Sequence, residues 1–274
     1  MESVLPTTPF GRRSLALAHI ASQMAAKHRS PEAAANKWLV FQDLCAAKLR
    51  LGLPDRSLTV LEALLTFHPE TVLTGDDLIV FPSNDRLALR AKGMAHTTMR
   101  RYLALLVDAG IIIRRDSPNG KRFARKTAGG SIRQAFGFDL APIVARAAEF
   151  KNLAEEVQAD RCALQYSRER ISLARRDIVK MIATGLDEGV SIPATGQGPS
   201  TWEAVHALYR AIAARIPRAG GLTDIEPIAE ELTALAQQLL KEYQLTPAEL
   251  TSVRVAPGRY GWALKDEEPY VCAS

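Results

Sequence analysis

Apolar side chains recur at intervals of seven along the middle of this chain, and this pattern constrains the fold more than any other. A seven-residue period places such residues on one side of an α-helix. The sequence therefore predicts one helix over residues 141–184, about 65 Å long at 1.5 Å per residue. This helix must pack against other helices of the chain or pair with a second copy, and the sequence leaves both open. The repeating positions are Ile143, Phe150, Val157, Leu164, Ile171 and Ile178.

Two further helices are predicted after a linker rich in Gly and Pro at residues 185–200. Each follows a capping box, in which a Ser or Thr and a Glu three residues later satisfy backbone amides of the first helical turn. The boxes are Ser200 with Glu203, before a helix over 202–216, and Thr223 with Glu226, before a helix over 225–243.

A pair of helices joined by a tight turn is predicted upstream of the long helix. The hydroxyl of Ser83 can cap the first helix, over residues 84–92, by accepting a bond from an amide of the first turn. Gly93 permits a sharp turn. The second helix, over residues 96–109, ends at Gly110, a usual helix-terminating residue.

A hairpin is predicted directly after this helix pair. The β-branched residues 111–113 favour a strand, and residues 121–126 and 132–138 favour two more, separated by glycines. Two helices, a tight turn and a following hairpin are the elements of a winged helix-turn-helix, in which the second helix enters the major groove of DNA.

The expected fold class is mainly α with a small β-wing. Apolar residues make up 47% of the chain and aromatic residues only 6%, which favours helix over sheet. The expected divisions are an N-terminal helical extension (1–54, with a helix over 31–51), a winged helix-turn-helix domain (55–140), the long helix (141–184), the linker (185–200), a helical C-terminal segment (201–250) and an irregular tail (251–274).

Positive charge is concentrated in the predicted winged domain. Residues 86–133 hold twelve Lys or Arg against only Asp108 and Asp116, a net of +10 in a chain whose total is +5. A positive block in an otherwise acidic chain favours a polyanionic partner, and double-stranded DNA fits it. The alternative is a solvated surface with nearby counter-charges.

The second helix of the pair should present polar and basic side chains to base edges and phosphates, while the hairpin should mainly neutralise phosphates. The residues expected to contact DNA are Arg90, Lys92, His96, Thr97, Thr98, Arg100, Arg101, Arg114, Arg115, Asn119, Lys121, Arg122, Arg125 and Lys126.

No catalytic centre is predicted, and the chain is not expected to be an enzyme. The Gly120-Lys121 pair lacks the rest of a phosphate-binding loop. The histidines are scattered singly and the three cysteines stand far apart, so no metal site, cofactor or disulfide framework is expected. No stretch is long and apolar enough to span a membrane. These features predict a cytoplasmic protein.

Several segments resemble the RepC replication initiators of repABC plasmids from alphaproteobacteria. The resemblance is most specific from Arg114 to Arg125 (RRDSPNGKRFAR), and it covers about residues 9–185. Further matching segments are Pro9-Phe10-Gly11-Arg12-Arg13, Phe81-Pro82-Ser83-Asn84, Gly93-Met94, Thr98, Arg100-Arg101, Ala109-Gly110 and Phe136-Gly137-Phe138-Asp139-Leu140.

The resemblance implies a plasmid-encoded initiator that binds double-stranded DNA at the replication origin and recruits host replication proteins without hydrolytic chemistry. Members of this family continue into a further helical domain, so the tail without helical period suggests a truncated or frameshifted copy. Two alternatives stay open from the sequence. One is a transcriptional regulator with the same module, forming a homodimer through its long helix, and the other is a coiled-coil adaptor.

Overall fold

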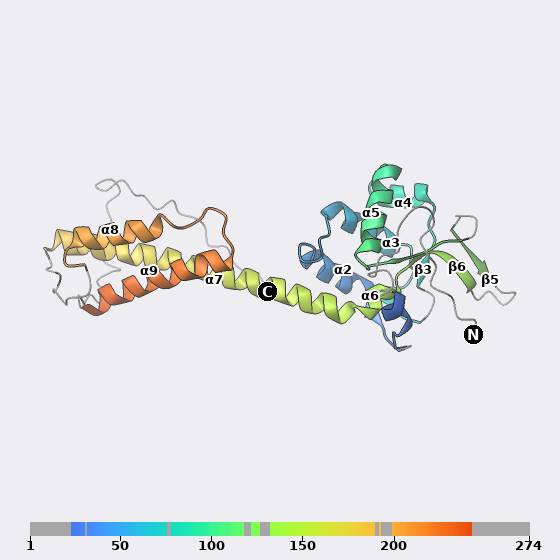
Figure 1. Cartoon of the computed structure of the whole chain (residues 1–274), viewed down its shortest axis with the longest axis horizontal. Helices are drawn as coiled ribbons and strands as arrows, with labels where there is room; N and C mark the ends of the chain where they lie inside the picture. Colours follow the sequence, from blue (N-terminus) through green and yellow to red (C-terminus); the bar gives the residue numbers. More distant parts are fainter. Residues whose placement is uncertain are drawn as a thin grey trace. The chain divides into compact units, whose positions relative to one another are not determined.

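The computed structural model describes residues 23–30, 32–75, 78–117, 122–126, 132–189, 192 and 199–242. For residues 124–126, 132–134 and 242 the description is of the backbone alone. The chain divides into two compact units, Met1–Ala159 and Asp160–Ser274. The described part is mainly helical with small antiparallel sheets, as predicted (Figure 1). The predicted tail over 251–274 and half of the predicted linker lie outside the described residues.

The first unit surrounds one apolar core. Leu61 and Leu64, Met99 and Leu106, and Phe138 are fully buried in it and come from a helix, a second helix and a strand. The elements are β1 (Ala35–Asn36), α2 (Lys37–Ala46), α3 (Asp55–Leu65), β2 (Val72–Leu73), β3 (Ile79–Val80), α4 (Asn84–Arg90), α5 (His96–Asp108), β4 (Ile113–Arg115), β5 (Phe123–Lys126), β6 (Ile132–Asp139) and α6 (Ala141–Ala145), followed by α7 (Ala147–Asp187), which begins in this unit and continues into the second.

Strand β6 organises the larger sheet. Its last residues pair antiparallel with β3 on one side and β4 on the other, while its first residues pair with β5. Gly137 lies where β6 crosses β3, and a Cβ placed there would come within 2.2 Å of the Val80 carbonyl oxygen. The absence of a side chain at Gly137 therefore allows β3 and β6 to approach. Figure 1 shows the β5–β6 hairpin extending away from the grouped helices α3, α4 and α5.

The predicted helix over residues 31–51 is shorter than expected. Ala35 pairs with Leu73 in a small antiparallel sheet, so the chain is extended immediately before α2. Asn36 then caps the helix, because its side-chain oxygen accepts a bond from the Trp38 amide (3.0 Å). Leu73 is remote from Ala35 in the sequence. Helical periodicity therefore could not predict this pairing.

The predicted single helix over residues 141–184 is broken at Arg146, which separates α6 from α7. The Arg146 guanidinium donates to the carbonyls of Ala109 (3.1 Å) and Gly110 (3.0 Å), at the C-terminal end of α5. It also forms two bonds with the Glu149 carboxylate (2.7 and 2.8 Å) and stacks over the Phe150 ring. These bonds lower the pKa of Glu149. Arg146 thus joins the end of α5 to the first turn of α7.

The described part of the second unit is a cluster of three helices. Helices α8 (Trp202–Ala213) and α9 (Leu222–Glu242) pack with the later part of α7 around a second apolar core. The seven-residue row serves both cores, since Ile143 and Phe150 are buried in the first and Ile171 and Ile178 in the second. The sequence left open whether the long helix packs against its own chain or against a second copy. For Ile171 and Ile178, helices of the same chain cover the apolar row.

Both predicted capping boxes are wrong. Thr201, not Ser200, caps α8, and its hydroxyl accepts from the Ala204 amide (3.2 Å). Helix α9 starts three residues earlier than predicted, at Leu222. The Glu226 carboxylate contacts the hydroxyl of Ser167 and the guanidinium of Arg170 (2.8 Å) on α7 instead of capping its own helix. At Glu226, contacts with another helix, available only in the folded unit, replace the predicted local cap.

Replacing Glu226 with Gln should lower the stability of the second unit at neutral pH, and this difference should disappear on acidification. The Ser167 hydroxyl and then the Arg170 guanidinium hold the pKa of the Glu226 carboxyl below its ordinary value. A carboxylate with a depressed folded pKa stabilises the fold above its unfolded pKa, and this stabilisation is lost as pH falls through the folded pKa. Urea unfolding at pH 7 and at several values below about pH 4 would measure the effect.

Glu230, exposed on the same helix, offers a matched control, and Glu230→Gln should unfold like the unmodified chain at every pH. An equal loss of stability in Glu226→Gln at acidic and neutral pH would contradict the assignment of a charged contact.

Candidate nucleic-acid interface

The predicted helix pair around Gly93 is present. The Ser83 hydroxyl accepts from the Arg86 amide (3.3 Å) at the start of α4, which confirms the predicted cap. Gly93 has a φ of 72°, which confirms the predicted turn, and α5 begins at His96. Helices α4 and α5 pack on each other, and both pack on α3.

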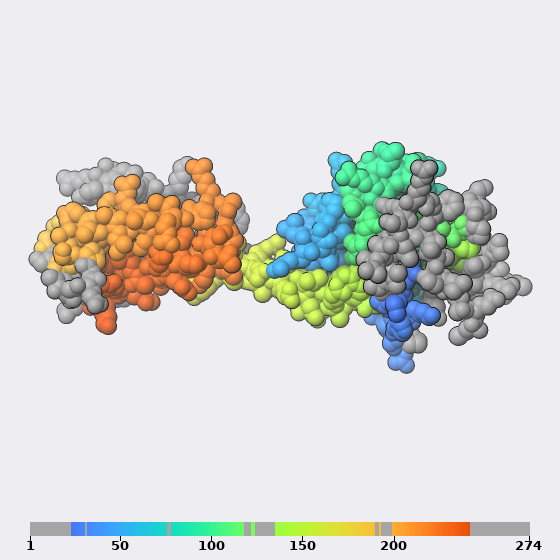
Figure 2. Space-filling view, in the orientation of Figure 1, coloured from blue at the N-terminus to red at the C-terminus, as the bar shows by residue number. Residues whose placement is uncertain are grey.

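Helix α5 has one buried and one exposed face. Met99, Leu103 and Leu106 are buried in the first core, whereas Arg100 and Arg101 are exposed. Thr97 is also exposed, and Thr98 is half-buried. Residues around 90–110, green in Figure 2, form part of the molecular surface.

The exposed cations on and beside α5 differ in their contacts. The side chains of Lys92 and Arg101 form no hydrogen bond or ion pair with any other residue that the structure describes, while the Arg100 Nε donates to the His96 carbonyl (3.3 Å). The His96 Nε2 lies 3.2 Å from a carboxylate oxygen of Asp85 on α4. The guanidinium of Arg101 and the ammonium of Lys92 are therefore available to an external anion.

Arg90 and Arg114 are exposed residues with partners nearby. The Arg90 guanidinium donates to both the carbonyl and the hydroxyl of Thr66 (2.8 Å each) and stacks over the Phe67 ring. The Arg114 Nε lies 2.8 Å from the Asp116 carboxylate. Arg90 thus links the end of α4 to the end of α3, a structural contact in addition to any role in binding.

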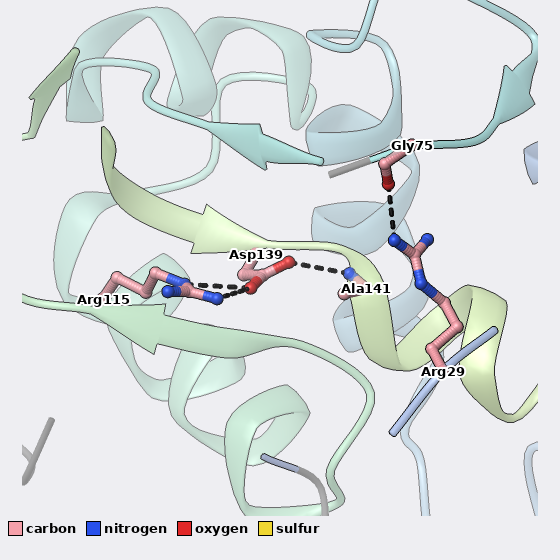
Figure 3. Close-up of polar contacts among 5 residues, drawn as sticks. All are labelled: Arg29, Gly75, Arg115, Asp139 and Ala141. Carbon is pink, nitrogen blue, oxygen red and sulfur yellow. Dashed lines mark hydrogen bonds and ion pairs between the residues drawn. The ribbon is translucent and has the colours of Figure 1, made fainter. Parts of the chain in front are cut away.

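Arg115 lies within the sheet and not on an open surface. It donates from Nε (2.9 Å) and from a terminal nitrogen (2.6 Å) to one oxygen of Asp139, a carboxylate that is only 2% exposed (Figure 3). The other Asp139 oxygen accepts from the Ala141 amide (2.8 Å) at the start of α6. Arg115 and Asp139 therefore join β4, β6 and α6. Figure 3 also shows Arg29 donating to the Gly75 carbonyl.

Arg122 attaches the beginning of the hairpin to the loop before α4. Its guanidinium donates to the Pro82 carbonyl (3.0 Å) and lies 4.5 Å from the centroid of the Phe138 ring. Burial, and then the nearby charge of Arg114, lower the pKa of Arg122. An arginine remains charged even when partly buried, so Arg122 brings a fixed positive charge to the base of the hairpin.

Two of the remaining predicted contacts fall on the β5–β6 hairpin. Arg125 and Lys126 lie in β5, where Arg125 pairs with Gln134 of β6, but their side chains are outside the description. Asn119 and Lys121 lie outside the described residues. The hairpin is held near its base by the packed rings of Phe123 and Phe136, whose centroids are 5.3 Å apart.

The comparison with known proteins identifies the family. The model for the N-terminal domain of replication protein C matches residues 13–186. The chain belongs to the replication protein C family. No solved structure matches it.

Two curated sequences that carry the name replication protein C are similar to this family member. One, from Sinorhizobium fredii (strain NBRC 101917 / NGR234), is 47% identical over 234 residues, which cover 85% of this chain and 56% of the relative. The other, from Rhizobium rhizogenes, is 45% identical over 246 residues, which cover 89% and 59%. The chain thus spans somewhat more than half the length of the curated relatives it matches.

Two groups that hold this replication protein C domain together were not singled out from the sequence. Arg146 has no local signal, because its carbonyl partners at residues 109 and 110 are remote in sequence. Asp139 has a weak local signal. An acidic residue shortly before a proline, here Pro142, is typical of the start of a helix.

Within the part of the chain that the structure describes, no group of three His, Cys, Asp or Glu side chains could hold a metal ion. Nor does any helix in the described ranges have the length and apolar character needed to cross a membrane.

Proposed function

We propose that this chain binds double-stranded DNA at a plasmid replication origin and recruits host replication proteins there. Helices α4 and α5 and the β5–β6 hairpin would act as a winged helix-turn-helix, with α5 in the major groove and the hairpin against the backbone. Membership of the replication protein C family supports a role in plasmid replication. No catalytic step is proposed for the chain.

The exposed face of α5 is the observation that carries this proposal. Its inward side is fixed in the core by Met99 and Leu106, while Arg100 and Arg101 are exposed. A guanidinium can donate two parallel bonds to the O6 and N7 atoms of guanine, or neutralise a phosphate. A rigid helix with arginines on its open face suits contact with a duplex groove.

The predicted contact residues are proposed to divide into three groups. Lys92, Arg100 and Arg101 would contact DNA directly, together with His96, Thr97 and Thr98 at the start of α5. Arg90, Arg115 and Arg122 would mainly hold the elements in place, because each is bonded within the domain. The remaining residues would neutralise phosphates. They are Arg114 of β4, Arg125 and Lys126 of β5, and Asn119 and Lys121 between these strands in the sequence.

A transcriptional regulator that dimerises through its long helix is less well supported. Such an arm needs an open apolar row, but Ile171 and Ile178 of α7 are buried by α8 and α9 of the same chain. The relatives' name also points to replication.

Competition binding tests the proposal. The purified chain should bind a duplex carrying the replication origin of its own plasmid at least about tenfold more tightly than a random duplex of equal length, because specific protein–DNA complexes exceed non-specific ones by large factors. A promoter fragment with two half-sites one helical turn apart would serve as a comparison. Equal binding to origin and random DNA at moderate salt would contradict origin recognition, and preference for the promoter would favour a regulator.

A further inference from the structure

The turn between α4 and α5 contains a lysine where the chain would be expected to use glycine. The Ala91 amide donates to the Leu87 carbonyl (2.8 Å), and the Gly93 amide donates to the Ala88 carbonyl (2.9 Å). In this pattern of helix ending, the residue directly before the second donor is left-handed. That residue is Lys92, and its φ is 59°.

Lys92 is an exception among the left-handed positions of the described residues. The others are all glycine, and they comprise Gly52, Gly75, Gly93, Gly110 and Gly189. In a left-handed conformation the Cβ of an L-residue lies close to its own following carbonyl oxygen, so lysine is less favourable there than glycine. The turn therefore carries a conformational cost that a glycine would remove.

Nothing else in the described part of the fold requires lysine at this position. Its side chain is exposed and forms no hydrogen bond or ion pair with any other described residue. The surroundings are open as well, since a Cβ built on the adjacent Gly93 would have no atom within 4 Å. Unfavourable backbone conformations of this kind are concentrated at functional sites. We therefore look for a contact of the Lys92 side chain with a ligand outside the chain.

We propose that Lys92 binds a backbone phosphate of duplex DNA and that the domain gives up stability to keep a positive charge at this turn. This inference rests on the proposed DNA-binding function. The turn leads directly into α5, and the ammonium is a compact charge on a flexible stem that suits a phosphate oxygen. A phosphate contact fixes the position of the helix on the duplex without distinguishing base sequences.

Two variants of the full chain test the inference. Lys92→Gly removes both the strain and the charge, and it should raise the midpoint of thermal unfolding by about 2–4 °C. The slope of log affinity against log salt concentration should become shallower by about 0.9, equally for origin and scrambled duplexes, because one phosphate contact is lost. Lys92→Arg should keep the slope and the unfolding midpoint of the unmodified chain.

Lys151, exposed on α7, provides the charge control, and Lys151→Gln should leave the salt slope unchanged. An unchanged slope in Lys92→Gly would overturn the phosphate contact, and a lower unfolding midpoint would overturn the stability cost. If Arg100→Ala/Arg101→Ala loses binding while Lys92→Gly binds with the original slope, the proposed function stands and this inference fails. If the unmodified chain binds no duplex, both fail.

Discussion

Replacing Arg100 and Arg101 together with alanine should weaken binding to the origin duplex by about 2–6 kcal/mol, a loss of roughly 30-fold or more. Both side chains are exposed on α5, and neither residue belongs to the buried core. Alanine is the strongest helix former, so the fold should keep its stability or gain slightly. Fluorescence anisotropy with labelled duplexes would measure affinity, and thermal unfolding by circular dichroism would measure stability.

A matched control removes two arginines from an exposed helix elsewhere. Arg161 and Arg168 of α7 are exposed and belong to the second unit, and their double alanine variant should bind the origin duplex like the unmodified chain. Unimpaired binding by the Arg100→Ala/Arg101→Ala variant would place the DNA contact on another surface and refute the assignment to α5.

Replacing Asp139 with alanine should destabilise the first unit by about 3 kcal/mol. The substitution leaves the partly buried Arg115 guanidinium without its partner and removes the acceptor of the Ala141 amide. Unpaired buried donors are costly because they lose water without gaining a protein acceptor. Urea unfolding would give the loss of stability, and hydrogen exchange of the β4 and β6 amides should show faster opening of the sheet.

The Arg115→Met/Asp139→Leu double variant separates the ion pair from the general effect of substitution. Replacing both charged groups with apolar ones leaves no unpaired charge, so the double variant should lose less stability than the sum of the two single variants. Additive losses would show that Arg115 and Asp139 contribute independently.

The helix pair was predictable from the sequence because its boundaries are set by local chemistry. The hydroxyl of Ser83 and the conformational freedom of Gly93 act within a few residues of where they stand. The same reasoning failed for Glu226, which was also predicted to cap the start of its own helix. Its carboxylate instead contacts Ser167 and Arg170 of α7. Local patterns predict correctly only when no distant partner competes for the same side chain.

The sequence predicted that positive charge is concentrated in this domain. It did not predict which basic side chains are exposed and which bond within the domain. Arg101 and Arg122 are equally basic in the sequence, yet one is exposed on α5 and the other is bonded to the Pro82 carbonyl and stacked on Phe138. Which arginine binds within the domain depends on carbonyls and rings brought near by the sheet. A count of charges along the chain contains no such information.

The guanidinium of Arg146 bonds to the two carbonyls that directly follow α5 and to the first turn of α7 at the same time. A tilt of α5 must either stretch these bonds or draw the start of α7 along with it. Arg146 therefore couples the position of the C-terminal end of α5 to the position of the first turn of α7. A ligand that displaces α5 while these bonds hold should therefore also displace the start of α7.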